Sequence, residues 1–156
     1  MEQFIRKILV IGLIIFLLMQ LYQPARNDYS GQVLPTDVAK VYKVPPEVQA
    51  TLTTSCYDCH SNNTVYPWYS YIQPARMLLD SHIEEGKGEL NFSEFGSYSN
   101  RKQETKLKSI GSQVKSGEMP LDSYTLLHKD AELTTEKKRT LLNWIENIQD
   151  SLATTF

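Results

Sequence analysis

The sequence predicts an all-α protein, with an apolar helix at the N-terminus and one small helical domain after it. Apolar residues recur at helical spacing in several segments, and proline, glycine or hydroxyl side chains bound these segments. No segment shows the alternation of apolar and polar residues that is typical of a strand. A length of 156 residues suits one domain, and a hydrophobic content of 41% suits a folded globular one.

The charge of the chain excludes one class of partner. The formal net charge is −2. Glu2, Arg6 and Lys7 together contribute +1, so the rest of the chain carries −3. Proteins that bind nucleic acid need a basic surface. We therefore expect no nucleic-acid partner.

The N-terminus has the pattern of an export signal. Arg6 and Lys7 precede an apolar run from Ile8 to Met19, and no small residues form a cleavage site after it. We predict an uncleaved signal anchor over residues 1–23, a single-pass transmembrane helix; a cleaved signal is the alternative. Cations before the run place the domain on the periplasmic, extracytoplasmic side of the cell membrane.

A polar linker is predicted over residues 24–35, and the domain over residues 36–156. A hydroxyl or carboxyl side chain at position 36 or 37 caps a brief first helix. Pro46 suits the first position of a second helix, which we expect to end near Cys56.

Three longer helices follow, at about residues 74–88, 100–115 and from 134 onward. In the helix at about residues 74–88 we expect Met77, Leu78 and Ile83 to be buried. We expect Gly86 and Gly88 to end this helix. Gly117 closes the second. The last is the longest amphipathic helix, and we expect it to pack on the helix that begins at Pro46.

The segment Cys56-Tyr57-Asp58-Cys59-His60 holds both cysteines of the chain. A Cys-x-x-Cys-His motif is typical of covalent haem attachment, in which each thiol forms a thioether and the histidine is the proximal iron ligand. A zinc site would need a second ligand pair, and a thioredoxin-like redox disulfide would need a βαβ context. We therefore predict one covalently attached haem c.

The loop after His60 is rich in aromatic residues. These rings form either a small aromatic core or contacts to the haem edge, where hydroxyl and indole groups bind propionates. The Pro67 carbonyl is a candidate acceptor for the second ring nitrogen of His60. The candidate haem-edge residues are Tyr66, Pro67, Trp68, Tyr69 and Arg76.

Met119 is the candidate distal ligand. Its thioether is a soft ligand for haem iron, and Pro120 restrains the backbone beside it. A lone methionine more often fills a core, and His82, His128 and Met77 are competing ligands. The position of Met119, in a loop after a helix and far along the chain from His60, favours a ligand on the opposite face of the haem.

These segments resemble a known family. The layout of helix, CYDCH, helices, Met-Pro loop and final helix resembles class I cytochromes c, and the detailed match is to bacterial haem-binding domain proteins. The matching stretches are SCYDCHSNNTVYPWYSYIQP (55–74), HIEEGK (82–87), LNFSEF (90–95), GEMPLDSYTLLH (117–128) and the final LNWI. The resemblance implies a cytochrome c-like bundle of about four to five short helices around one haem. It implies Cys56 and Cys59 as attachment points and His60 as axial ligand, and Met119 stands in the matching loop.

The function predicted from these features is electron transfer. We expect a membrane-anchored monohaem c-type cytochrome that exchanges single electrons with redox partner proteins outside the cytoplasm, and not an enzyme. If Met119 does not bind the iron, the alternative is a haem-based sensor or an accessory subunit of a peroxidase-like redox enzyme with an open distal iron site.

Overall fold

The computed structural model describes residues 1–153, and it is helical without strands over that range. The predicted all-α class is therefore confirmed. One isolated antiparallel bridge joins Asp28 to Asn63. The α-helices are α1 (Glu2–Met19), α2 (Val38–Val41), α3 (Pro46–Ser55), α4 (Tyr57–His60), α5 (Ala75–Glu89), α6 (Asn100–Ser116), α7 (Asp122–Thr125) and α8 (Thr135–Ala153). The 3-10 helices are η1 (Trp68–Tyr71), η2 (Phe92–Ser97) and η3 (Lys129–Ala131).

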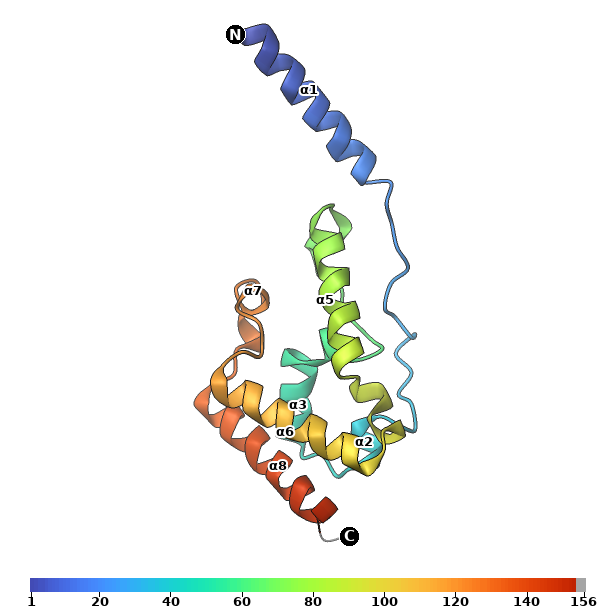
Figure 1. Ribbon diagram of the computed structural model, residues 1–156, viewed down its shortest axis with the longest axis vertical. Coiled ribbons are helices and arrows are strands. Elements are labelled where there is room, and N and C mark those ends of the chain that lie inside the picture. Colours follow the sequence, from blue (N-terminus) through green and yellow to red (C-terminus); the bar gives the residue numbers. More distant parts are fainter. Residues whose placement is uncertain (154–156) are drawn as a thin grey trace.

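The predicted transmembrane helix is wrong. Helix α1 extends away from the domain (Figure 1), but no helix within residues 1–153 is long and apolar enough to cross a membrane. The 18 residues of α1 span about 27 Å, less than the hydrocarbon core of a bilayer. They also include the charged side chains of Glu2, Arg6 and Lys7, so the apolar run is shorter than the helix.

The hydrophobic core lies among α3, α6 and α8. Helix α8 packs against both α3 and α6, as the lower part of Figure 1 shows. Leu52, Leu107, Leu141 and Trp144 are buried there, together with Phe92 and Phe95 from η2. The prediction that the last helix packs on the helix beginning at Pro46 is confirmed.

The helix ends follow the chemistry predicted for them. The Asp37 carboxylate accepts a hydrogen bond of 2.9 Å from the Ala39 N–H and caps α2. Pro46 occupies the first turn of α3. Gly117 ends α6 with a φ of 82°, a left-handed conformation that favours glycine. Helix α3 thus ends one residue before Cys56 and positions the cysteine motif.

Helix α5 differs from its prediction in two ways. It continues through Gly86 and Gly88 to Glu89, so the glycines do not end it. Its buried face carries Arg76 and Leu79, whereas Met77 and Leu78 are 47% and 60% exposed. The Arg76 guanidinium can be buried because its Nε donates to Asp80 at 2.5 Å and its Nη2 donates to the Pro24 carbonyl at 3.2 Å.

The predicted linker packs onto the domain. The Asn27 amide donates to the Ser61 carbonyl and to Thr64 Oγ1, both at 2.8 Å. The Tyr66 hydroxyl accepts from the Asn27 N–H at 2.7 Å. This segment is therefore fixed over the residues that follow the cysteine motif.

Candidate functional site

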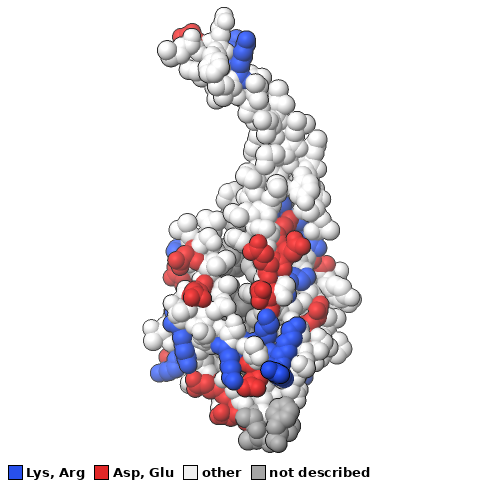
Figure 2. Space-filling model, in the orientation of Figure 1, with Lys and Arg blue, Asp and Glu red and all other residues white. Residues whose placement is uncertain are grey.

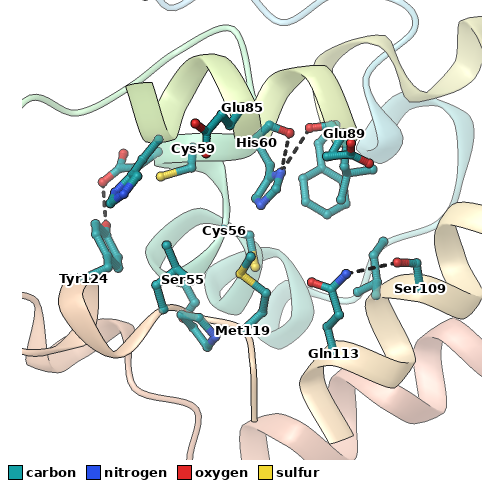
Figure 3. A pocket seen from close by; sticks show the side chains of 18 of the residues that line it. Ser55, Cys56, Cys59, His60, Glu85, Glu89, Ser109, Gln113, Met119 and Tyr124 are labelled. Carbon is teal, nitrogen blue, oxygen red and sulfur yellow. Dashed lines mark hydrogen bonds between the residues drawn. The ribbon is translucent and has the colours of Figure 1, made fainter. Parts of the chain in front are cut away.

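A cavity of about 530 Å3 lies between α4 and α5 on one side and α6 and the Met119 loop on the other. This volume is typical of a cofactor or ligand site. Its walls come from segments far apart in the sequence, as Figure 3 shows. The lining side chains and backbone belong to Ser55, Cys56, Asp58, Cys59, His60, His82, Glu85, Gly86, Glu89, Leu90, Phe92, Lys106, Ser109, Ile110, Gln113, Met119, Pro120, Leu121 and Tyr124.

Both cysteines line this cavity as free, half-buried thiols. Burial raises the pKa of the Cys56 thiol to about 12 and that of Cys59 to about 11. Both thiols are therefore protonated near neutral pH. Reactive redox cysteines have lowered pKa values, so this pair differs from a thioredoxin-like site.

His60 is held in one tautomer. Its Nδ1–H donates to the Gly86 carbonyl at 2.8 Å and to the Leu90 carbonyl at 3.1 Å. A carbonyl only accepts hydrogen bonds, so Nδ1 carries a proton, and in the neutral imidazole Nε2 has the free lone pair. Figure 3 shows the imidazole pointing from the α5 side into the cavity. Such a hydrogen bond is how proteins fix and orient a ligating histidine.

The acceptors of the His60 ring differ from the one considered from the sequence. The Pro67 carbonyl instead accepts hydrogen bonds from the Ser70 N–H and hydroxyl. Gly86 and Leu90 lie 26 and 30 residues from His60, so no local pattern indicates them.

Gly86 also allows the close approach of α4 and α5. A Cβ at this position would lie 2.7 Å from the Cys59 carbonyl oxygen, closer than side chains pack. Only glycine therefore lets the backbone of α5 come near enough to accept from His60.

Met119 approaches the cavity from the opposite wall, as Figure 3 shows. Its N–H donates to the Gln113 carbonyl at 3.3 Å, which ties the loop to the end of α6. Cys56, Cys59, His60 and Met119, all predicted as site residues, thus surround one cavity.

The competing ligands lie in different places. His82 lines the cavity from α5. His128 lies outside the lining, where its Nε2 forms a hydrogen bond of 2.9 Å with the Tyr69 hydroxyl. Met77 is also outside the lining.

The predicted haem-edge residues do not line this cavity. Trp68 is 75% exposed. Arg76 is 1% exposed, stacks on the Tyr66 ring at 4.5 Å and is paired with Asp80. Tyr66 and Arg76 instead connect the loop after His60, the linker and α5. The Tyr69 hydroxyl forms a hydrogen bond with His128.

The cavity wall formed by α6 is absent from the sequence-based prediction. Lys106, Ser109 and Gln113 lie on it at helical spacing. The Lys106 side chain is only 22% exposed. Acidic side chains gather over α5 and basic ones over α6 on the face drawn in Figure 2. Lys106 therefore gives the α6 wall a charge opposite to that of Glu85 and Glu89.

A family model for a haem-binding domain matches residues 14–147 of the chain. The chain belongs to the haem-binding domain family. Neither a curated protein nor a solved structure matches it significantly. The family assignment indicates haem binding, and the cavity is the place in the structure that suits a haem.

The residues around the cavity fit this cofactor. They supply two free thiols, an imidazole with a fixed tautomer and a thioether. Imidazole and thioether are iron ligands in haem proteins. Within residues 1–153, no group of three or more His, Cys, Asp and Glu side chains is arranged to hold a metal ion.

Proposed function

We propose that this haem-binding domain is a monohaem c-type cytochrome that transfers single electrons. The observation that carries the proposal is the pair of hydrogen bonds from His60 Nδ1 to the carbonyls of Gly86 and Leu90. They leave Nε2 available as an iron ligand beside a cavity lined by both thiols. A histidine with two strong acceptors on one nitrogen is oriented before the cofactor enters.

The two thiols would hold the haem covalently. Each S–H would add across one vinyl group, so that a carbon–sulfur bond would form and the thiol proton would go to the other vinyl carbon. No oxidant is needed for this addition. The thiols must be free, and both are.

Met119 would close the other face of the iron. The bound iron would supply a one-electron couple, and a methionine ligand raises its potential. With His60 and Met119 both as ligands, the iron would have no position left for a substrate. We therefore infer a carrier whose electrons come from and go to other redox proteins outside the cytoplasm, and not an enzyme.

Lys106 would bind a haem propionate. Its ammonium lies 3.5 Å from a carboxylate of Glu89, but the Glu89 side chain is 84% exposed, so this pair is weak. A haem propionate within the cavity would be less exposed to solvent than Glu89 and would form a stronger ion pair with Lys106. Ser109 and Gln113 on the same wall carry further polar groups.

Two measurements on the purified protein test the proposal. A denaturing gel stained for haem shows whether attachment is covalent, and visible spectra of the ferric and ferrous protein show whether methionine binds. We expect a stained band and a long-wavelength methionine–iron band in the ferric protein. Absence of haem on the gel contradicts a c-type site. Rapid carbon monoxide binding to the ferrous protein indicates an open iron site and the sensor or accessory-subunit alternative.

Replacement of the candidate ligands identifies the distal one. We expect Met119→Ala to retain attached haem, lose the methionine–iron band and lower the potential. His82→Ala, on the same cavity, and Met77→Ala, outside it, should leave the band unchanged. Loss of the band in His82→Ala with its retention in Met119→Ala would assign the ligand to His82.

A further inference from the structure

Helix α7 lies next to the cavity without a hydrophobic anchor of its own. It has four residues, none of them buried, and it stands apart from the α6 and α8 pair in Figure 1. Leu126 and Leu127, directly after it, are 68% and 62% exposed. A helix this short is not stable alone. Its position therefore depends on the polar contacts that join it to the rest of the molecule.

The first of these contacts is made by Tyr124. Its hydroxyl donates to Asp58 Oδ2 at 2.7 Å. Figure 3 shows Tyr124 at the end of the cavity where Cys59 lies. The other oxygen of Asp58 accepts from the Val65 N–H at 2.9 Å, so the carboxylate itself is fixed. Burial and the hydrogen bond to Asp58 raise the pKa of Tyr124, which keeps the hydroxyl a donor.

The second contact is made by His128. Its Nε2 forms a hydrogen bond of 2.9 Å with the Tyr69 hydroxyl. Its ring also stacks on that of Tyr124, with centroids 4.3 Å apart and an interplanar angle of 12°. The segment after Met119 is thus tied at two points to the segments around the cysteine motif.

Tyr124 is firmly connected to the Met119 loop. The N–H groups of Tyr124 and Thr125 both donate to the Leu121 carbonyl at 3.0 Å. Pro120 and Leu121 line the cavity beside Met119. A displacement of Tyr124 from Asp58 therefore moves the loop that carries the methionine.

We propose that Tyr124 is a positioning residue that holds Met119 on the haem iron through its hydrogen bond to Asp58. This inference rests on the proposed function, in which Met119 is the distal ligand. It assigns a role to Asp58, which lies between the two cysteines: a residue of the attachment motif controls the ligand on the opposite face. His128, which lies outside the cavity, helps to hold Tyr124 in place through its hydrogen bond to Tyr69 and its stacking on the Tyr124 ring.

The test is the rate at which imidazole replaces methionine in the ferric holoprotein, followed by loss of the methionine–iron band. Loss of a hydrogen bond between a hydroxyl and a carboxylate favours opening of the loop. We expect Tyr124→Phe to accelerate replacement about tenfold, which corresponds to about 1.4 kcal/mol. Tyr71→Phe, an exposed tyrosine outside the cavity lining, is the matched control and should not change the rate.

A double-mutant cycle separates the hydrogen bond from other effects of the substitutions. In an Asp58→Ala background, Tyr124→Phe should cause no further acceleration, because the acceptor is already gone. His128→Ala removes the second contact without altering the cavity lining and should also accelerate replacement. An unchanged rate in Tyr124→Phe overturns the positioning role, whatever the rate in His128→Ala.

Met119→Ala distinguishes the two proposals. If it changes the ferric spectrum while Tyr124→Phe leaves the imidazole rate unchanged, only the positioning role of Tyr124 fails. If Met119→Ala has the spectrum and imidazole rate of the unaltered protein, Met119 is not the ligand. The proposed function then fails in its assignment of the distal ligand.

Discussion

The structure of the site requires a residue without a side chain at Gly86. Its carbonyl accepts the hydrogen bond of His60, and its Cα faces the Cys59 backbone. A side chain here would separate α4 from α5 and move the acceptor away from the imidazole. Gly86 thus allows α4 and α5 to pack closely, and its carbonyl helps to fix the tautomer of His60, the proposed ligand.

Gly86→Ala should destabilise the protein. Its Cβ would lie 2.7 Å from the Cys59 carbonyl oxygen, and relief of this overlap requires backbone shifts that cost about 1–3 kcal/mol. Gly88→Ala is the matched control, because nothing lies within 4 Å of its added Cβ. Alanine is the better helix former, so the control should gain up to about 1 kcal/mol. Urea unfolding of both holoproteins measures the difference, and equal stabilities would contradict the packing role.

Single residues show which parts of the site the sequence predicts. Cys56, Cys59 and His60 lie close together in the chain, and Met119 stands in a recognisable Met-Pro loop. Local pattern was sufficient to select these four residues, which line one cavity. The acceptors of the His60 proton and the α6 wall come from distant segments. These acceptors and this wall reach the site only through tertiary packing, which no local sequence pattern indicates.

At the scale of helices, the predicted positions are correct where apolar periodicity and a capping or terminating residue indicate the same helix. Helices α3, α6 and α8 each combine an apolar stripe with a recognisable start or stop. In α5, Ile83 is buried as predicted, but Met77 and Leu78 are exposed. Arg76 is buried on this helix because an ion pair with Asp80 and two linker carbonyls satisfy its guanidinium. Helix α7 was missed because four residues are too few to show a period.

The cap of α2 gives this domain a pH-dependent contribution to its stability. Burial raises the pKa of the Asp37 carboxyl, and the hydrogen bond from the Ala39 N–H only partly offsets this. The folded state therefore holds the proton more tightly than the unfolded state. This contribution to stability is present below the unfolded pKa and is lost as the pH rises through the folded pKa.

Asp37→Asn should remove this dependence while it keeps an oxygen that accepts from Ala39. We expect the free energy of unfolding of the variant, relative to the unaltered protein, to increase from pH 4 to pH 7. Asp37→Ala loses the cap and should cost about 1 kcal/mol at both pH values. Urea unfolding at the two pH values measures these differences. A constant difference between Asp37→Asn and the unaltered protein would show that burial of the carboxyl does not perturb its ionisation.

At the scale of the whole molecule, the N-terminal segment is attached to the domain by specific polar contacts. Gln73 is fully buried, and its side-chain amide donates to the Tyr22 carbonyl at 2.7 Å. The Gln73 N–H donates to Gln20 Oε1 at 2.9 Å. Asn27 connects the linker to the loop after the cysteine motif. The linker is thus part of the folded domain, and its position depends on the loop that follows His60.

Asn27→Ala should release the linker from the domain. The substitution removes the donor to Ser61 and Thr64, and the acceptor of a 2.6 Å hydrogen bond from Lys87 Nζ. Loss of about 1.4 kcal/mol of net hydrogen bonding would make the opened linker about ten times more populated. Trypsin cleavage after Arg26 should accelerate by the same factor, because cleavage requires that the segment leave the surface. Gln23→Ala, which removes only a 3.1 Å bond to the Gln20 carbonyl, is the control and should leave the rate unchanged. Equal cleavage rates in the two variants would show that the linker is not held by Asn27.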